Sequence, residues 1–271
     1  MLYLIRQFHV SGLKKIETHS ISNDVGETEK RLSINCTINY GNWSKLSRPL
    51  VGLLSFPRSG NTWTRHLLEL ATGIYTGSLT NAGGLYRKGL KAEFDDPQLG
   101  RALVYKSHHY TELFKSGILL IRNPYDSLIS WHIFRLSGFM GNPTLEVFRN
   151  STVWINFVKH HYVKWLKLIA TSLESGMPII IVRYEDLVHN PLRQLDRMLQ
   201  FMNMTLTAER VECINTDLEG VFHRRHPDKF YFDPFSQELH DIIDEDIRIV
   251  NNMLKKRKED PVPMPKYDDE L

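Results

Sequence analysis

The stretch LLSFPRSGNTW, residues 53–63, decides the fold of this chain. VGLLSF (51–56) is an apolar run of strand length, and PRSGN after it is a turn that contains glycine. TWTRHLLELATG then carries apolar residues at helical spacing and ends at Gly73. A strand, a tight loop and an amphipathic helix in this order form one βα unit, the element from which parallel sheets are built.

Further strands and helices alternate along the chain. Continuous apolar runs predict strands at 102–106, 117–121 and 178–182. Capping residues and apolar spacing predict helices after Asn123-Pro124, across 154–168, after Asn190-Pro191 and from Ser236 to the basic cluster 255–258. Strands that are apolar throughout are typical of a parallel sheet covered on both faces. We therefore expect an α/β fold with a central parallel sheet flanked by helices on both faces.

The composition sets limits on the class of protein. The 271 residues suit one large domain or at most two small ones, and a composition of 42% apolar and 24% charged residues excludes a fibrous or disordered chain. A net charge of +3 does not demand a nucleic-acid groove. No apolar run approaches the roughly 20 residues of a membrane span. The two cysteines, Cys36 and Cys213, exclude a disulfide scaffold and a multi-cysteine metal cluster, and spacing alone leaves their pairing open.

The loop between the first strand and helix has the composition of a phosphate-binding site. Such a loop presents backbone N–H groups at the positive end of the helix dipole. Gly60 lets an anion approach the backbone, and Arg58 adds a fixed positive charge. Further side-chain donors are Ser59, Asn61 and Thr62. The Walker A pattern G-x-x-x-x-G-K-[ST] is not matched, and an ordinary strand-to-helix turn remains the alternative.

Arg122 follows the strand predicted at 117–121, at the strand end where open α/β sheets bind ligands. Asn123, Ser127 and Ser130 follow at positions i, i+4 and i+7, on one face of the next helix. An arginine and a serine so placed can bind one phosphate from two sides. The alternative is a surface ion pair beside a polar helix face.

Lys106 and His108 come at the end of the strand predicted at 102–106. Because they are two residues apart, their side chains are expected to project to one side of the strand end. A histidine beside a phosphate site is a candidate general base. His66 and His109 are competing candidates for this role.

The three segments together resemble the family of sulfotransferases that use 3′-phosphoadenosine 5′-phosphosulfate (PAPS). Members of this family carry, in this order, the patterns P-[KR]-S-G-x-T-W, K-[ST]-H and R-N-P-x-D-x-x-x-S. Over about residues 51–254 the chain is most similar to the sulfotransferase domain of the WSC-domain-containing proteins. The matching stretches are SFPRSGNTWTRHLLELATGIYTGS, ILLIRNPY, YEDL, GVFHRR and DPF.

The resemblance implies a role for each matching residue and requires no metal. The loop Arg58, Ser59, Gly60, Asn61 and Thr62 would hold the 5′-phosphosulfate, and Trp63 would pack near the adenine. Arg122 and Ser130 would bind the 3′-phosphate, and Arg224 would close over it. His108 would be the catalytic base, with Lys106 and Arg58 stabilising the departing phosphate.

Two departures from the family pattern raise an alternative function. Arg58 stands where cytosolic members have lysine, and an arginine stays charged and cannot donate a proton. Asn61 stands where many members have a hydroxyl. The alternative is a catalytically inactive nucleotide-binding or interaction protein on the same fold. Glu69 on the loop's helix is a further candidate base, which we expect at the surface.

The domain division follows from these patterns. We expect an N-terminal arm at 1–48, a single P-loop-like sulfotransferase domain at 49–258 and a Pro-rich acidic tail at 259–271. The acceptor is a small molecule or a glycan, with a carbohydrate hydroxyl favoured, and residues 76–100 and 137–153 are expected to line its site. The resemblance, together with the sequons at Asn35, Asn42, Asn150 and Asn203, favours the Golgi or secretory lumen, with the cytoplasm as alternative. The oligomeric state stays open.

Overall fold

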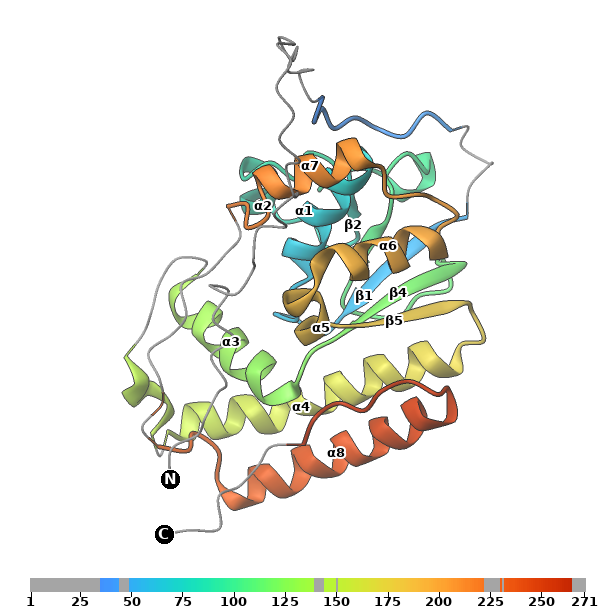
Figure 1. The fold of residues 1–271 in the computed structure, drawn as a ribbon. Coiled ribbons are helices and arrows are strands. Elements are labelled where there is room, and N and C mark those ends of the chain that lie inside the picture. The colour runs from blue at the N-terminus through green and yellow to red at the C-terminus, as the bar shows by residue number, and fades with distance from the viewer. Residues whose placement is uncertain are drawn as a thin grey trace, which may run out of the picture.

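Five parallel strands form the centre of the computed structural model, which describes residues 35–43, 49–138, 144–149, 151–221, 230 and 232–264. In spatial order the strands are β2 (Gly77–Ser78), β3 (Tyr105–Ser107), β1 (Val51–Ser55), β4 (Ser116–Ile121) and β5 (Ile179–Arg183) (Figure 1). Each neighbouring pair is parallel, with Leu53 opposite both Lys106 and Ile118. The predicted α/β fold with a central parallel sheet is confirmed.

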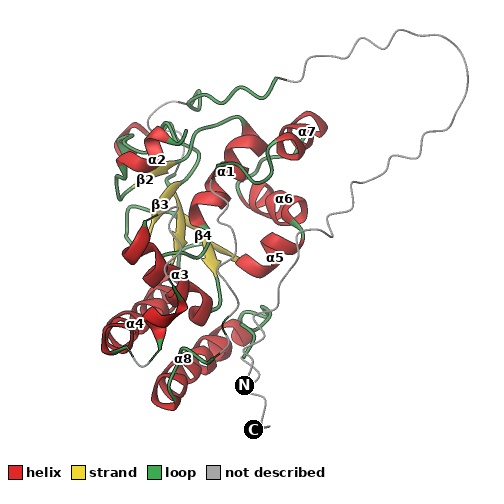
Figure 2. Cartoon of the chain, turned by 90° about the vertical axis from the view of Figure 1, so that its left-hand side faces the viewer, coloured by secondary structure: helices red, strands yellow, loops and turns green. Residues whose placement is uncertain are grey.

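Helices cover both faces of this sheet (Figures 1 and 2). One face carries α1 (Asn61–Thr72), α6 (Pro191–Phe201) and α7 (Ala208–Thr216), and the other carries α3 (Pro124–Ser137), α4 (Thr152–Glu174) and α8 (Gln237–Lys256). Neighbouring strand residues point to opposite faces, so Leu53 packs in the core beneath α1 and Leu54 in the core beneath α3 and α4. This alternation explains why the strands are apolar throughout.

The predicted helix boundaries rest on caps that the structure contains. The Asn123 side chain accepts a hydrogen bond from the N–H of Tyr125 (3.0 Å), and the Asn190 side chain accepts one from the N–H of Arg193 (3.1 Å). Gly73 ends α1 in a left-handed conformation. The sequence therefore places α3, α6 and α1 correctly at these ends.

The structure differs from the predicted elements at the sheet edge. β3 begins at Tyr105 and not at 102, although Ala102, Leu103 and Val104 are buried. These residues are apolar because they line the core, and apolar character alone does not separate a strand from a buried loop. The structure also contains six elements that the sequence does not predict. These are the longer helix α7 and the short elements β2, α2 (Gly83–Arg87), α5 (Tyr184–His189), η2 (Pro97–Leu99) and η3 (Leu145–Phe148).

The described part of the predicted N-terminal arm is docked on the domain. Asn39 pairs with the chain after α1, where its N–H donates to the carbonyl of Gly73 (2.9 Å) and its carbonyl accepts from the N–H of Tyr75 (2.9 Å). A disulfide joins Cys36 to Cys213 in α7. In the part of the chain that the structure describes, no helix is long and apolar enough to cross a membrane.

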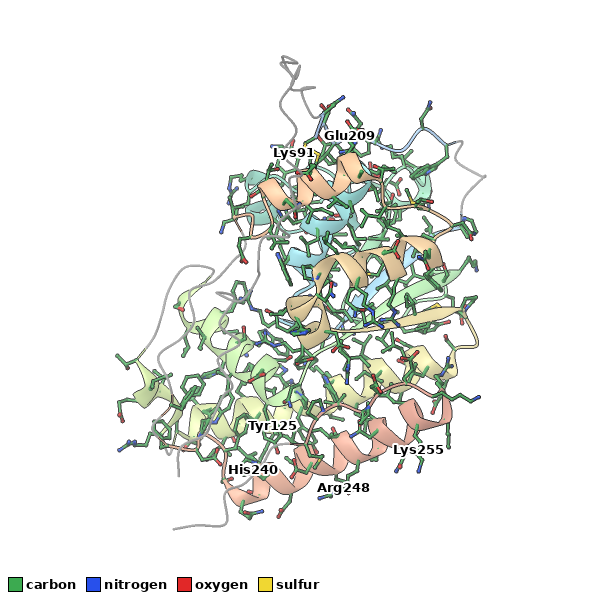
Figure 3. The ribbon with its side chains drawn as sticks, in the orientation of Figure 1. Lys91, Tyr125, Glu209, His240, Arg248 and Lys255 are labelled. Atoms are coloured by element: carbon green, nitrogen blue, oxygen red, sulfur yellow. A yellow bond between two sulfur atoms is a disulfide. The ribbon has the colours of Figure 1, made fainter. Side chains whose placement is uncertain are left out.

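A buried polar cluster fastens α8 to α3 (Figure 3). The Tyr125 hydroxyl donates to Asp244 (2.8 Å) and lies 3.1 Å from Nδ1 of His240, whose Nε2 lies 2.7 Å from the carboxylate of Asp233. Because buried polar groups are stable only when they are hydrogen-bonded, this cluster fixes the position of α8 against the start of α3. The start of α3 forms one side of the candidate site.

Candidate functional site

The loop from β1 to α1 lies at the carboxyl edge of the sheet. Arg58 and Gly60 both have left-handed backbone conformations, with φ of 65° and 90°. Gly60 caps α1 without a side-chain hydrogen bond, so its helix leaves N–H groups of the first turn for an anion. Arg58 holds its left-handed conformation at a cost of roughly 1–2 kcal/mol, a kind of strain that clusters at functional sites.

The start of α3 borders this loop. Nε of Arg58 donates to the hydroxyl of Ser130 (3.3 Å), and the guanidinium lies 4.9 Å from the centre of the Phe134 ring. The hydroxyls of Ser59 and Ser127 lie 3.4 Å apart and fasten the loop to the same helix. The structure thus brings Arg58 to Ser130, and the phosphate site expected between Arg122 and Ser130 stays a prediction.

Arg122 joins this group from the end of β4. Its Nη1 donates to the main-chain carbonyl of Arg58 (2.9 Å), and its guanidinium lies 4.5 Å from the centre of the Tyr184 ring. Its Nε is buried and has no hydrogen-bond partner among the described residues. A buried guanidinium N–H without an acceptor is costly, so it marks a place where an anionic oxygen would be stabilised.

Tyr184 was not singled out as a site residue on its own, and the structure places it at the centre. Its ring lies where a side chain on Gly60 would have to go, and it meets the Trp63 ring edge-on with 6.3 Å between centres. Tyr184 follows β5 directly, at the same sheet edge as Arg122, and this position is the signal that could have found it. The indole N–H of Trp63 donates to the carbonyl of Leu218 (2.8 Å).

Two acidic residues lie near Arg122. The Glu185 side chain accepts a hydrogen bond from the N–H of Asn123 (3.0 Å). Burial raises the pKa of both Glu185 and Asp126 above the ordinary carboxyl values, and the positive charge of Arg122 opposes this rise. The buried Nε of Arg122 is bound by neither carboxylate in the described part of the chain.

The side chains of the first turn of α1 face different ways. Asn61 is buried, with 4% of its surface exposed, and its Nδ2 donates to the carbonyl of Leu53 (3.2 Å) and the hydroxyl of Ser55 (3.0 Å). Thr62 and Trp63 are half-buried on the other side of the turn. The side chain of Asn61 therefore binds β1 and not an anion in the loop. Only the backbone N–H of Asn61 is placed to donate to an anion.

His108 lies beside this loop, and a hydrogen bond determines which of its ring nitrogens carries the hydrogen. Its Nδ1 is 2.7 Å from the carbonyl oxygen of Ser55. Because a carbonyl oxygen only accepts, Nδ1 carries the hydrogen, and Nε2 of the neutral ring has a free lone pair. Burial lowers the pKa of His108 to about 4, with a further lowering from Lys106, so the ring is neutral at pH 7. A neutral Nε2 is what a general base needs.

Lys106 is buried next to it, with 8% of its surface exposed. Burial lowers the pKa of its ammonium group to about 8, and the positive charges of Arg65 and Arg58 lower it further against the raising effect of Glu93. A lysine with this pKa is able to exchange a proton near neutral pH.

The remaining candidates for the base lie elsewhere. Glu69 was expected at the surface, and this expectation is wrong, because its helix is packed between the sheet and α7. Its carboxylate is buried and accepts hydrogen bonds from the N–H (2.8 Å) and the hydroxyl (2.7 Å) of Thr76, and burial raises its pKa to about 7. His66 contacts the carbonyl of Asp217 (2.7 Å), and His109 is exposed. Arg224 lies outside the described residues.

Beneath the site, Arg65 and Glu93 form an ion pair (2.5 Å) with both side chains fully buried. Arg65 also donates to the hydroxyl (2.9 Å) and the carbonyl (2.7 Å) of Thr76. This pair holds the loop that carries Glu93 against α1. The charge of Glu93 also raises the pKa of Lys106, and the charge of Arg65 lowers it. The buried pair therefore affects the protonation of Lys106 as well as the stability of the fold.

Fold and site together define a class of protein: an α/β domain whose β1–α1 loop lies at the carboxyl edge of a parallel sheet, with a neutral histidine beside it. The sulfotransferase domain model matches residues 49–220, and the chain belongs to this family.

The chain is similar to members of the WSCD family. The WSCD family member AAEL009094 of Aedes aegypti is 32% identical over 209 residues, which are 74% of this chain and 65% of that protein. The WSCD family member CG9164 of Drosophila melanogaster is 30% identical over 216 residues, which are 77% of this chain and 67% of that protein. Sulfotransferase 1A1 of Rattus norvegicus is 25% identical over 187 residues (59% and 62%). The chain therefore spans about two thirds of the length of these relatives. Among solved structures, mouse sulfotransferase SULT7A1 complexed with PAP is similar with a TM-score of 0.49 and 15% identity, over 77% of this chain and 88% of that one.

Proposed function

We propose that this protein transfers the sulfuryl group of PAPS to an acceptor hydroxyl on a carbohydrate, with His108 as the base. The observation that carries the proposal is the contact between Nδ1 of His108 and the carbonyl of Ser55, which leaves Nε2 free beside the β1–α1 loop.

The residues present fit the phosphates of PAPS. The loop Arg58, Ser59, Gly60, Asn61 and Thr62 would hold the 5′-phosphosulfate, chiefly through main-chain N–H groups and the Arg58 guanidinium. Arg122 and Ser130, with Arg224, would bind the 3′-phosphate, and Trp63 would lie against the adenine. The unpaired N–H groups at the start of α1 and the buried Nε of Arg122 support this assignment, because both lack acceptors among the described groups.

When bound, PAPS supplies a sulfuryl group on a phosphate that is a good leaving group. His108 Nε2 accepts the proton of the acceptor hydroxyl as that oxygen forms its bond to sulfur. The Arg58 guanidinium and the N–H groups of α1 stabilise the negative charge that grows on the departing phosphate oxygen as its bond to sulfur breaks.

Lys106 complements Arg58 in this scheme. Arg58 stabilises charge but does not release a proton, whereas Lys106 has a pKa lowered to about 8. Lys106 would stabilise the transferred group as an ammonium ion and is the one of the two able to donate a proton to the phosphate.

Exposed aromatic residues within 76–100, the stretch expected to line the acceptor site, support a carbohydrate acceptor. Tyr86 and Phe94 are 42% and 53% exposed, their ring centres lie 5.6 Å apart, and the ammonium of Lys91 lies 5.0 Å from the Tyr86 ring centre. Exposed rings with a neighbouring cation offer both a flat apolar face and a hydrogen-bond donor to a sugar.

The disulfide between Cys36 and Cys213 supports a location in an oxidising compartment such as the secretory lumen, because disulfides are rare in proteins of the reducing cytosol. The location in the Golgi remains part of the proposal.

The first experiment measures ligand binding by thermal shift with PAP, AMP and Mg-ATP. A ligand at about 100 times its Kd stabilises the fold by roughly 2.7 kcal/mol. We expect PAP to stabilise the protein well above AMP. No stabilisation by PAP would favour the inactive interaction protein, and stabilisation by Mg-ATP alone would favour a P-loop kinase or hydrolase.

The second experiment tests the base with transfer of radiolabelled sulfate from PAPS to a panel of neutral glycans, acidic glycans and phenols. His108→Ala should lower kcat by about 10²–10⁴ with little change in PAP affinity. His109→Ala is the matched control, since His109 is the adjacent exposed histidine, and it should keep near wild-type activity. Retained activity in His108→Ala would contradict the assignment of the base.

A further inference from the structure

The side chain of Asn61 has only one orientation that its surroundings permit. The carbonyl oxygen of Leu53 can only accept a hydrogen bond, so the amide nitrogen of Asn61 must face it. The same nitrogen donates to the hydroxyl of Ser55. The amide oxygen, Oδ1, is therefore turned away from β1, and it is buried without a hydrogen-bond partner among the described residues.

This arrangement has a cost. A buried acceptor without a donor destabilises a protein by roughly 1–3 kcal/mol. A side chain that only filled space would need no amide group, so the two donated hydrogen bonds to β1 are the feature to explain.

The two acceptors of Asn61 are two residues apart at the end of β1. On one side of the strand the pairing with β4 continues to Ser55, opposite Leu120. On the other side the pairing with β3 stops one residue earlier, at Leu54 opposite Ser107. The carbonyl of Ser55 consequently projects beyond the paired part of β3, where it accepts a hydrogen bond from the His108 ring (2.7 Å).

We infer that Asn61 is a positioning residue for His108: by holding the Leu53 carbonyl and the Ser55 hydroxyl, it fixes the Ser55 carbonyl that keeps the hydrogen of His108 on Nδ1. The inference rests on the proposed role of His108 as the base. It gives a function to the residue that departs from the hydroxyl common at this place in the family. It also joins the phosphate-binding loop to the base through one side chain.

The consequence is a link between the start of α1 and the lone pair of Nε2. Without Asn61 the end of β1 keeps its pairing with β4 but loses both hydrogen bonds from the amide, so the Ser55 carbonyl is held less firmly and the ring of His108 is able to exchange its hydrogen between the two nitrogens. The form with hydrogen on Nε2 cannot accept a proton from the acceptor. Nucleotide binding depends on backbone N–H groups and arginines, which the change leaves in place.

The test compares Asn61→Ala with wild type in three measurements: kcat with its pH profile, the Kd of PAP, and ¹H–¹⁵N spectra of the histidine rings. The His108 signals are assigned by their loss in His108→Ala. For Asn61→Ala we expect kcat to fall by about 10–100-fold while the Kd of PAP changes by less than about threefold. The ring spectrum of His108 should change from hydrogen on Nδ1 alone to a mixture of both forms.

Ser55→Ala is the matched variant, because it removes the hydroxyl and keeps the main-chain carbonyl. Its effect should be smaller than that of Asn61→Ala, since the hydrogen bond to Leu53 remains. Asn61→Ser, which leaves a smaller void, replaces Asn61→Ala in all measurements if the alanine variant does not fold, and the same criteria then apply.

The outcomes separate the inference from the proposed function. A folded Asn61 variant with wild-type kcat, pH profile and His108 spectrum would overturn the positioning role, even with His108→Ala inactive. An active His108→Ala would instead overturn the proposed base, and with it the inference. A variant whose melting temperature alone falls would show that Asn61 is merely structural.

Discussion

The disulfide between Cys36 and Cys213 joins residues 177 positions apart and offers a quantitative test of how the fold is stabilised. The perturbation is the double variant Cys36→Ser with Cys213→Ala. Alanine is chosen in α7 because Cys213 is fully buried and a hydroxyl there would lack a partner. Serine suits Cys36, which is half-buried.

The expected loss follows from the length of the closed loop. The chain-entropy relation for a loop of this size predicts about 5 kcal/mol of stabilisation, acting mainly on the unfolded state. The folded segment keeps other contacts, since Asn39 still pairs with the chain after α1 and the N–H of Gly41 still donates to the carbonyl of Arg101 (2.8 Å). The site should therefore keep its geometry while the free energy of unfolding falls.

Urea unfolding followed by circular dichroism measures this loss, with wild type in reductant as a second comparison. We expect the free energy of unfolding to fall by about 3–5 kcal/mol and the melting temperature to fall by roughly 5–10 °C. The Kd of PAP at low temperature should change by less than about threefold. A loss below about 1 kcal/mol, with both thiols shown to be free, would refute the loop-entropy argument. A large loss of PAP affinity in the folded variant would show that the disulfide acts on the site.

Three further predictions concern the site. Glu93→Gln should destabilise the fold by about 3–5 kcal/mol in urea unfolding, because it leaves Arg65 charged and buried without its partner, and the double variant with Arg65→Met should lose less than the sum of the two single changes. The pH profile of kcat/KM should rise as His108 loses its proton near its pKa of about 4 and fall as Lys106 loses its own near its pKa of about 8, and a profile flat from pH 6 to pH 10 would contradict the role of Lys106. Gly60→Ala should abolish PAP-induced thermal stabilisation, because a side chain there needs a strained positive φ and meets the ring of Tyr184.

Local patterns in the sequence predict the centre of the fold well. Apolar runs locate β1, β4 and β5, and the caps Asn123 and Asn190 locate the helices after them, because caps and buried parallel strands are read from neighbouring residues. The sheet edge is different: Ala102–Val104 is as apolar as a strand but lies in a buried loop, since burial and strand pairing produce the same composition.

The site divides in the same way. Arg58, Arg122 and His108 each come shortly after a strand, and parallel strands bring their carboxyl ends to one edge of the sheet, so the sequence is enough to place these three residues at that edge. Ser130 lies within α3, where its hydroxyl accepts a hydrogen bond from Arg58. The role of each side chain depends on the residues around it in space, and the spacing of residues along the sequence does not identify these neighbours.

Glu69 and Asn61 show this limit most clearly. From the sequence Glu69 was expected at the surface and Asn61 as a side-chain donor to the phosphosulfate, yet α7 and the loop at Thr76 cover Glu69, and β1 accepts both hydrogen bonds of Asn61. A helix packed between a sheet and a second helix buries some of its polar residues as well as its apolar ones, and these buried polar residues must find partners within the protein. For Asn61 those partners belong to the strand that orients His108. The positioning role inferred for Asn61 thus connects it to His108 through Ser55 of β1.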